Sequence, residues 1–277
     1  MIKRSKLAHS FLLPRKSHKD FPLGDSGRLH VQIMPPPFTS FFFRPLILCS
    51  SFCKVVVMQR VSAEEMGELE RIMIEKYNVS EEALMELAGE KLAKFIGGEF
   101  SKDLKIAFIL GKGGNGGDGA VCARRLNDRG FDVTVFTPYS EDELMDLTKK
   151  KFRGLEDEIK APHFPSSNVY VDGLIGYGLN GEVREPLVEA CEKINNWSSE
   201  TVSIDVPTGL DVNEQKIDEK AVKPDYTVAL GAVKHGVSST NSGEIYLADI
   251  GIMQEAFNRL DLEAPSFEAN NLIKAEE

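Results

Sequence analysis

The chain has 277 residues, of which 42% are hydrophobic and 27% are charged, and its formal net charge is −10. This composition fits one globular domain with or without an appendage, and it excludes collagen-like, disulfide-scaffold and broadly disordered proteins. The negative charge argues against a nucleic-acid-binding surface over the whole chain. The cysteines predict neither a disulfide framework nor a zinc site, because there are only four of them and they are scattered: Cys49, Cys53, Cys122 and Cys191. A reducing compartment, the cytoplasm, is therefore the default expectation.

Residues 1–57 differ in composition from the rest of the chain. They hold nine Lys and Arg residues against two acids, and they contain the runs Pro35–Pro37 and Phe41–Phe43 without a helical period. The apolar run at 45–53 is too short to span a bilayer, so no membrane segment is expected. We predict a basic disordered leader or an extension upstream of a start at Met58, and organelle targeting by this segment stays open.

From Met58 onward, predicted helices and strands alternate. Ser62 and Glu65 form a capping-box pattern that starts one helix, and a second helix is expected to begin at Ser80 and to stop at Gly97 and Gly98. Helical patterns follow at 120–129, 141–159 and 185–197, and short apolar runs predict strands at 105–110, 131–136, 168–175, 201–205, 225–230 and 244–250. After these only a short acidic tail is expected. The alternation predicts an α/β domain over 58–277, with a mainly parallel sheet covered by helices on both faces.

A glycine-rich loop follows the first strand of this pattern. Residues 111–116 satisfy G-x-G-x-x-G between a predicted strand and a predicted helix, which favours a nucleotide at the helix N-terminus. An ordinary dehydrogenase is not favoured, because no acid follows the second strand at Phe136 and because Asp118 would repel a phosphate placed directly on it. A Walker A loop is excluded because no Gly-Lys-Ser/Thr ends the run.

Two carboxylates are expected beside this loop. Asp172 and Asp205 lie at the ends of predicted strands, each just before a glycine turn. Because ligands bind at the carboxyl ends of parallel strands, we expect both acids and the loop at one edge. Asn115, Asp172 and Thr208 could also supply oxygen ligands to a hard cation.

The motifs resemble those of NAD(P)H-hydrate epimerases. Residues 111–119 resemble the family loop G-x-G-N-N-G-G-D-G, residues 171–186 its V-D-A-x-F-G-x-G segment through to R-E-P, and residues 203–211 its S-x-D-I-P-S-G-x-D. Residues 84–89 and 229–236 add two further blocks in family order. The resemblance implies a Rossmann-like three-layer α/β/α sandwich. It also implies exchange between the R and S forms of NADHX and NADPHX, which are hydrated at C6 of the nicotinamide ring.

The resemblance further implies a set of site residues. Carried over position by position, the substrate contacts fall on Gly114, Asn115, Gly116, Gly117, Asp118, Gly176, Tyr177, Gly178, Leu179, Asn180, Gly181, Glu182 and Asp205. One potassium ion per subunit is implied, with Asn115, Asp172 and Thr208 as ligands. The chain departs from the family pattern where Gly114 and Leu87 replace asparagines and Thr208 replaces a serine. Because many relatives fuse this domain to a dehydratase that this chain is too short to hold, a separate dehydratase is the expected partner.

Proton transfer at the C6 hydroxyl needs a positioned carboxyl that acts first as acid and then as base. Asp205 is the first candidate and Asp172 the second, since a cation would occupy Asp172. Lys234 and His235 are candidates for phosphate or ring contacts, with a solvated turn as the favoured expectation for both. Tyr177 either contacts a ring of the substrate or packs the loop. A non-catalytic nucleotide-binding or protein-interaction module of the same fold is the alternative. Homodimerisation and the choice between NADHX and NADPHX stay open.

Overall fold

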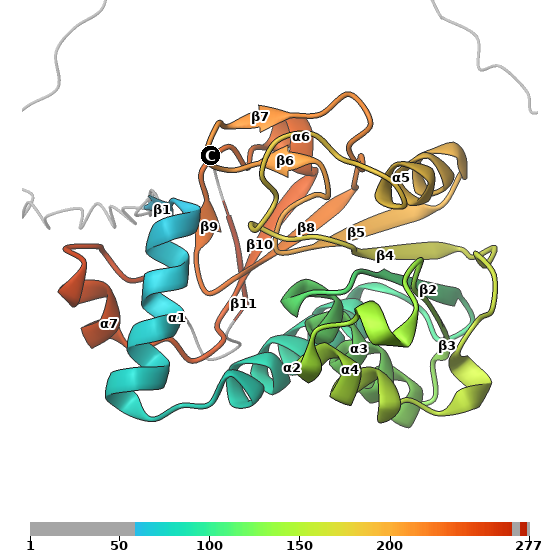
Figure 1. Cartoon of the computed structure of the whole chain (residues 1–277), viewed down its shortest axis with the longest axis horizontal. Helices are drawn as coiled ribbons and strands as arrows, with labels where there is room; N and C mark the ends of the chain where they lie inside the picture. The colour runs from blue at the N-terminus through green and yellow to red at the C-terminus, as the bar shows by residue number, and fades with distance from the viewer. Residues whose placement is uncertain (1–58, 268–271, 276–277) are drawn as a thin grey trace, which may run out of the picture. The chain divides into compact units, whose positions relative to one another are not determined.

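The computed structural model describes residues 59–267 and 272–275, so the predicted leader at 1–57 lies outside the described residues. Its centre is a seven-stranded sheet in which all neighbours are parallel except the edge pair β10 and β11 (Figure 1). In sheet order the strands are β11 (Leu272–Lys274), β10 (Glu244–Ala248), β8 (Tyr226–Leu230), β5 (Glu200–Ile204), β4 (Val169–Gly173), β2 (Lys105–Leu110) and β3 (Asp132–Phe136). Two short pairs lie beside it: β1 (Arg60–Val61) with β9 (Val233–Lys234), and β6 (Leu210–Asp211) with β7 (Lys216–Ile217).

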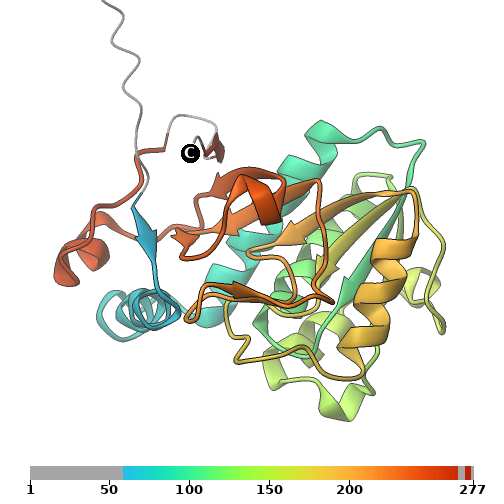
Figure 2. The same ribbon diagram turned by 90° about the horizontal axis from the view of Figure 1, so that it is seen from above.

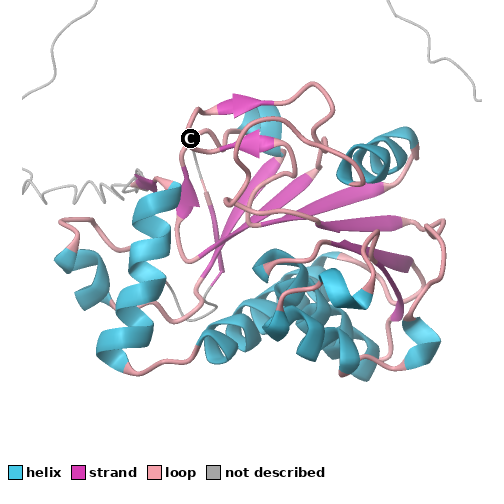
Figure 3. Cartoon of the chain, viewed as in Figure 1, coloured by secondary structure: helices cyan, strands magenta, loops and turns pink. Residues whose placement is uncertain are grey.

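Helices cover both faces of the sheet, which confirms the three-layer α/β/α prediction (Figure 3). One face carries α2 (Glu81–Glu99), α3 (Gly114–Asp128) and α4 (Asp146–Arg153), and the other carries α5 (Leu187–Asn196). The remaining helices are α1 (Ala63–Tyr77), α6 (Ser239–Ser242) and α7 (Gln254–Arg259), and α1 contacts α7 at one end of the sheet (Figure 2). None of the described helices is long and apolar enough to cross a membrane.

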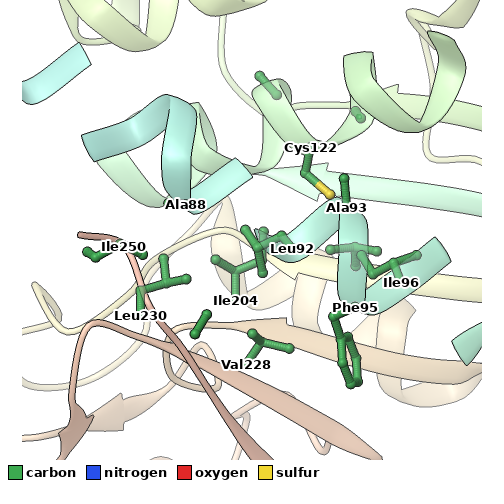
Figure 4. Close-up of a cluster of buried hydrophobic side chains, with 14 of the residues drawn as sticks. Ala88, Leu92, Ala93, Phe95, Ile96, Cys122, Ile204, Val228, Leu230 and Ile250 are labelled. Carbon is green, nitrogen blue, oxygen red and sulfur yellow. The ribbon is translucent and has the colours of Figure 1, made fainter. Parts of the chain in front are cut away.

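The main core lies between the sheet and the helices α2 and α3. Leu92, Ile96, Cys122, Ile204 and Val228 are completely buried there (Figure 4). The two helices approach closely because α2 has a glycine at the contact: a Cβ on Gly89 would lie 2.4 Å from a side-chain carbon of Val121. Strands buried on both faces produce the continuous apolar runs from which they were predicted.

Several observed elements differ from the sequence prediction. Helix α3 begins at Gly114, so the glycine run forms its first turns instead of a loop before residue 120. The predicted helix at 141–159 is broken into a 3₁₀ turn (Glu141–Glu143), α4 and a second 3₁₀ turn (Asp157–Ile159). The first break occurs because Leu144 is extended and buried, and because the N–H of Met145 donates to the carbonyl of Lys112.

Helix α2 also continues through Gly97 and Gly98 to Glu99 instead of stopping at the glycine pair. Neither Gly97 nor Gly98 has a positive φ, so the pair does not supply the left-handed residue with which a glycine ends a helix. The predicted acidic tail adds α7 and the antiparallel edge strand β11. These corrections move the ends of elements, divide one predicted helix and add α7 and β11, and they leave the predicted layer order intact.

Candidate active site

A cavity of about 430 Å³ opens at the carboxyl ends of the central strands. Strand β3 lies on one side of β2 and the later strands lie on the other, so the order switches between β2 and β4. The chain segments that leave these two strands line the cavity, together with α1, α2, the end of β5 and β9. Such a switch point is where open α/β sheets bind ligands, and the volume suits a small-molecule site.

The glycine loop supplies the floor of the cavity by close backbone contact. A Cβ on Gly111 would lie 1.7 Å from the carbonyl oxygen of Leu174, and one on Gly116 would lie 2.0 Å from that of Gly111. No side chain fits at either position, so the loop brings the N-terminus of α3 against the β4 segment. Of the predicted contact residues in this loop, Gly114, Asn115 and Asp118 line the cavity, whereas Gly116 and Gly117 are buried and do not. The unpaired N–H groups of the first helical turn favour an anion.

The segment after β4 divides into two parts. Gly176, Tyr177 and Gly178 line the cavity. Leu179 is buried in the core below α5, and the exposed Gly181 donates its N–H to Oδ2 of Asp211 at 2.8 Å. Of the predicted contacts in this segment, Gly176, Tyr177 and Gly178 are therefore in the cavity lining. The predicted contacts at Leu179, Asn180, Gly181 and Glu182 lie outside it.

Asp205 and Lys234 form a buried ion pair at the inner end of the cavity. The ammonium of Lys234 donates to Oδ1 of Asp205 and to the carbonyl of Leu230 at 2.6 Å. Lys234 is fully buried, so the expectation of a solvated turn was wrong for it. Its neighbour His235 is half-buried, outside the cavity lining, and donates its N–H to the carbonyl of Val61. The signal for burial was the apolar run 228–233 directly before the lysine.

The backbone places the Asp205 carboxylate toward the cavity. Its φ of 67° lies in the left-handed region, which a non-glycine residue adopts only when its surroundings hold it there. Oδ1 accepts from Lys234 and from the N–H of Leu230 at 3.2 Å, while among the described residues Oδ2 accepts only a long contact of 3.4 Å from the N–H of Tyr177. Oδ2 is therefore the atom left free to act on a ligand.

Glu70, on α1, is a cavity residue that sequence reasoning missed. It is half-buried, and its Oε2 accepts the phenol proton of Tyr177 at 2.9 Å. Burial raises the pKa of Glu70, and burial together with this carboxylate raises the pKa of the Tyr177 phenol, which keeps its proton. A charge on the buried stripe of α1, between Leu69 and Met73, was the available signal.

Asp118 faces the cavity from the first turns of α3. Burial raises the pKa of this carboxyl well above its ordinary value, and the nearby carboxylates of Asp205 and Glu70 raise it further, while Lys234 opposes them. Among the described residues no group donates a hydrogen bond to the Asp118 carboxylate. The cavity thus holds two kinds of carboxyl: Asp205, which is paired with a cation, and Asp118, whose pKa is raised by burial and by its acidic neighbours.

A group of buried oxygen atoms lies next to the cavity. Asp172 accepts hydrogen bonds from Ser203 Oγ at 2.8 Å and from Thr208 Oγ1 at 2.6 Å, and Thr208 Oγ1 lies 3.3 Å from the carbonyl oxygen of Ile175. Nδ2 of Asn115 is buried without a partner in the described part of the chain. Within that part no three His, Cys, Asp or Glu side chains could hold a metal, so a cation at this place would depend on one carboxylate and neutral oxygens.

The comparisons with known proteins agree on one family. Residues 81–236 match the family described as YjeF-related protein N-terminus. The chain is 32% identical over 221 residues to an NAD(P)H-hydrate epimerase of Elusimicrobium minutum, covering 73% of this chain and 100% of that protein. It is also 32% identical to an NAD(P)H-hydrate epimerase of Dictyostelium discoideum, covering 72% of this chain and 88% of the relative.

Longer relatives and a solved structure give the same result. The chain is 34% identical to a bifunctional NAD(P)H-hydrate repair enzyme of Archaeoglobus fulgidus, of which it spans 44%. The crystal structure of the yeast protein ynu0 superposes with a TM-score of 0.66 and 25% identity, covering 78% of this chain and 100% of that one. Sequence motifs and fold therefore lead to the same family.

Proposed function

Because the chain belongs to the NAD(P)H-hydrate epimerase family, we propose that it is an isomerase that interconverts the R and S epimers of NADHX and NADPHX at C6 of the nicotinamide ring. The observation that carries this proposal is the cavity at the strand switch point, where the glycine loop and the Asp205–Lys234 pair meet. A non-catalytic module of the same fold is not favoured, because such a module has no use for a buried charge pair that faces a cavity.

The reaction needs one proton donor and one proton acceptor. A proton given to the C6 hydroxyl lets it leave as water, and the lone pair of the ring nitrogen then forms a C=N bond that carries the positive charge. A water molecule that adds to the other face of C6 restores the hydroxyl and releases one proton, so that no atom is gained or lost. Each proton transfer of this kind contributes about 10²–10⁴-fold to the rate.

The two kinds of carboxyl in the cavity suit these two roles. Asp118, which accepts no hydrogen bond from the described residues and has a raised pKa, would give the proton to the departing hydroxyl. Asp205, which sequence reasoning assigned to both steps, already accepts hydrogen bonds from Lys234 and Leu230, and its free Oδ2 would take the proton of the returning water. Asp172, the second candidate, accepts four hydrogen bonds and does not line the cavity, so we assign it no proton step.

We further propose one potassium ion per subunit, held by Asn115, Asp172 and Thr208. The donor set fits a hard cation, since a buried carboxylate, a hydroxyl and a backbone carbonyl lie together and Asn115 would add its amide oxygen Oδ1. When bound, the ion would supply positive charge beside the glycine loop. The three side chains would hold it and thereby fix the loops that follow β2, β4 and β5.

Three further expectations concern partners and location. The bifunctional relatives support an NAD(P)HX dehydratase as the functional partner of this chain. A homodimer through the N-terminal helices is supported by Ile74 on α1 and Leu87 on α2, which are 40% and 41% exposed. A cytoplasmic location is supported by the free, buried thiols of Cys122 and Cys191. Light scattering of the full chain measures the dimer directly.

The test of the proposed function uses the full chain and one purified epimer of NADPHX in potassium buffer. Chromatography follows the appearance of the other epimer against the uncatalysed rate, starting from each epimer in turn. An isomerase brings both mixtures to the same final ratio faster than buffer does. If neither mixture changes faster than in buffer while NADP-type ligands still bind, the non-catalytic alternative replaces this proposal.

A further inference from the structure

The end of the cavity at Tyr177 combines an aromatic ring with an excess of carboxyl groups. Glu70 Oε2 accepts from the Tyr177 phenol at 2.9 Å, and the Tyr177 N–H faces Oδ2 of Asp205 at 3.4 Å. The ring is therefore held at both its hydroxyl and its backbone. The ammonium of Lys234 lies 5.5 Å from the centroid of this ring, so Tyr177 lies between the carboxylate of Glu70 and the ammonium of Lys234.

Charge at this end of the cavity is unbalanced. The side chains of Glu70, Glu81, Asp118 and Asp205 line it, whereas Lys234 is the cation that lies among them. Lys112 lines the cavity at the glycine loop, beside the ring of Tyr139. A neutral ring would leave the excess carboxyl groups poorly solvated, while a cationic ring would be attracted both by them and by an aromatic face.

We propose that Glu70 is a positioning residue which, by fixing Tyr177 and adding a carboxylate beside it, makes this end of the cavity bind a flat cationic ring in preference to a neutral one. The inference rests on the proposed function, in which the ring carries a positive charge between loss and return of water. Its consequence is a ligand class: a dinucleotide with an oxidised, cationic nicotinamide resembles that intermediate and binds more tightly than the reduced form.

Glu70 contributes this preference without touching the reacting atom. When Asp118 gives up its proton the cavity gains one negative charge at the moment the ring gains its positive charge. A carboxylate on α1 strengthens the same field, and because it is already in place it needs no reorganisation during the step. The interaction acts on the cationic ring more than on the bound substrate, so it affects kcat more than KM.

The test compares NADP⁺ with NADPH, which differ by one unit of ring charge. Equilibrium titration of the full chain gives both dissociation constants for the wild type, Glu70→Gln, Tyr177→Phe and Glu75→Gln. Gln at residue 70 still offers an oxygen to the Tyr177 phenol but carries no charge. Glu75 is the matched control, because it lies on the same helix with an exposed side chain that pairs with Arg71.

We expect the wild type to bind NADP⁺ about tenfold more tightly than NADPH, as a charge interaction over a few ångströms allows. Glu70→Gln should reduce this ratio toward one with little change for NADPH, and it should lower kcat for epimerisation more than it raises KM. Tyr177→Phe, which keeps the carboxylate but frees the ring, should weaken both ligands. Glu75→Gln should match the wild type.

A wild-type ratio near one, or a ratio that Glu70→Gln leaves unchanged, would overturn this inference. A wild-type ratio near one overturns the inference even if a variant fails to fold. The two proposals fail separately: a chain that epimerises NADPHX without preferring NADP⁺ refutes only the role of Glu70, and a chain that prefers NADP⁺ but does not epimerise refutes only the proposed function.

Discussion

Replacing Lys234 by methionine tests how the active site is held together. The Lys234 side chain is 0% exposed and that of Asp205 is 5% exposed, so the pair belongs to the buried class and not to the surface class, whose pairs contribute about 0–1 kcal/mol. Removing one partner of a buried pair leaves the other charge uncompensated and costs about 3–5 kcal/mol. The carbonyl of Leu230 also loses its donor. Since a domain is stabilised by about 5–15 kcal/mol in total, the loss should be large.

Urea unfolding of the full chain measures this cost as the change in the free energy of unfolding. The double variant Lys234→Met with Asp205→Asn should be more stable than Lys234→Met alone, because it no longer buries an unpaired carboxylate. Lys193→Met is the control, since Lys193 pairs with Glu189 on the exposed face of α5. A cost for Lys234→Met below about 1 kcal/mol, equal to that of the control, would refute the reasoning.

Three other substitutions test the remaining parts of the site. Gly116→Ala should lower the free energy of unfolding, measured in urea, by at least about 2 kcal/mol and should abolish NADP binding, because its Cβ would lie 2.0 Å from the Gly111 carbonyl oxygen. Normal NADP binding by this variant would contradict the close contact. Asp118→Asn should lower kcat by about 10²-fold or more. The same variant should unfold at a higher temperature than wild type at pH 7. The raised pKa of Asp118 stabilises the folded wild type fully below the ordinary pKa of 3.8, and this contribution is lost as pH rises, whereas asparagine has no proton to lose. The difference in unfolding temperature should therefore vanish below pH 3.8, and a difference that is the same at every pH would contradict the raised pKa. Thr208→Val should lower the free energy of unfolding by about 1–3 kcal/mol, because it removes a buried hydrogen bond to Asp172. It should also raise the potassium concentration needed for half-maximal activity, whereas Thr208→Ser should resemble wild type in both measurements. Activity that does not depend on potassium in the wild type and in both variants would contradict the cation site.

The parts of the site that sequence predicted are the ones encoded locally. The glycine loop, Asp172 and Asp205 each sit at the end of a strand, and the parallel order of the strands brings those ends together without further information. Layer order and the mainly parallel sheet followed from the same alternation. The segment at 179–182 shows the limit of a carried-over motif, because the chain turns away from the cavity after Gly178.

The parts that sequence did not predict depend on contacts between distant residues. Glu70 meets Tyr177 across 107 positions of the chain, and Lys234 meets Asp205 across 29. A lone charge in an apolar stripe is expected to be solvated until the element that covers it is known. The edge strand β11 could not be predicted from the sequence either. Its three residues are too few to show an alternating hydrophobic pattern, and they form a strand because they pair with β10.

The central claim is that this chain exchanges the two epimers by losing and regaining water at C6. The most direct measurement is epimerisation of one purified NADPHX epimer in water enriched in oxygen-18, followed by mass spectrometry of both epimers. The account predicts that every newly formed epimer carries the heavy oxygen at C6, at a rate that falls in the Asp118→Asn and Asp205→Asn variants. New epimer that retains the original oxygen would contradict the cationic ring, and with it the proposed proton transfers by the carboxyl groups of the cavity.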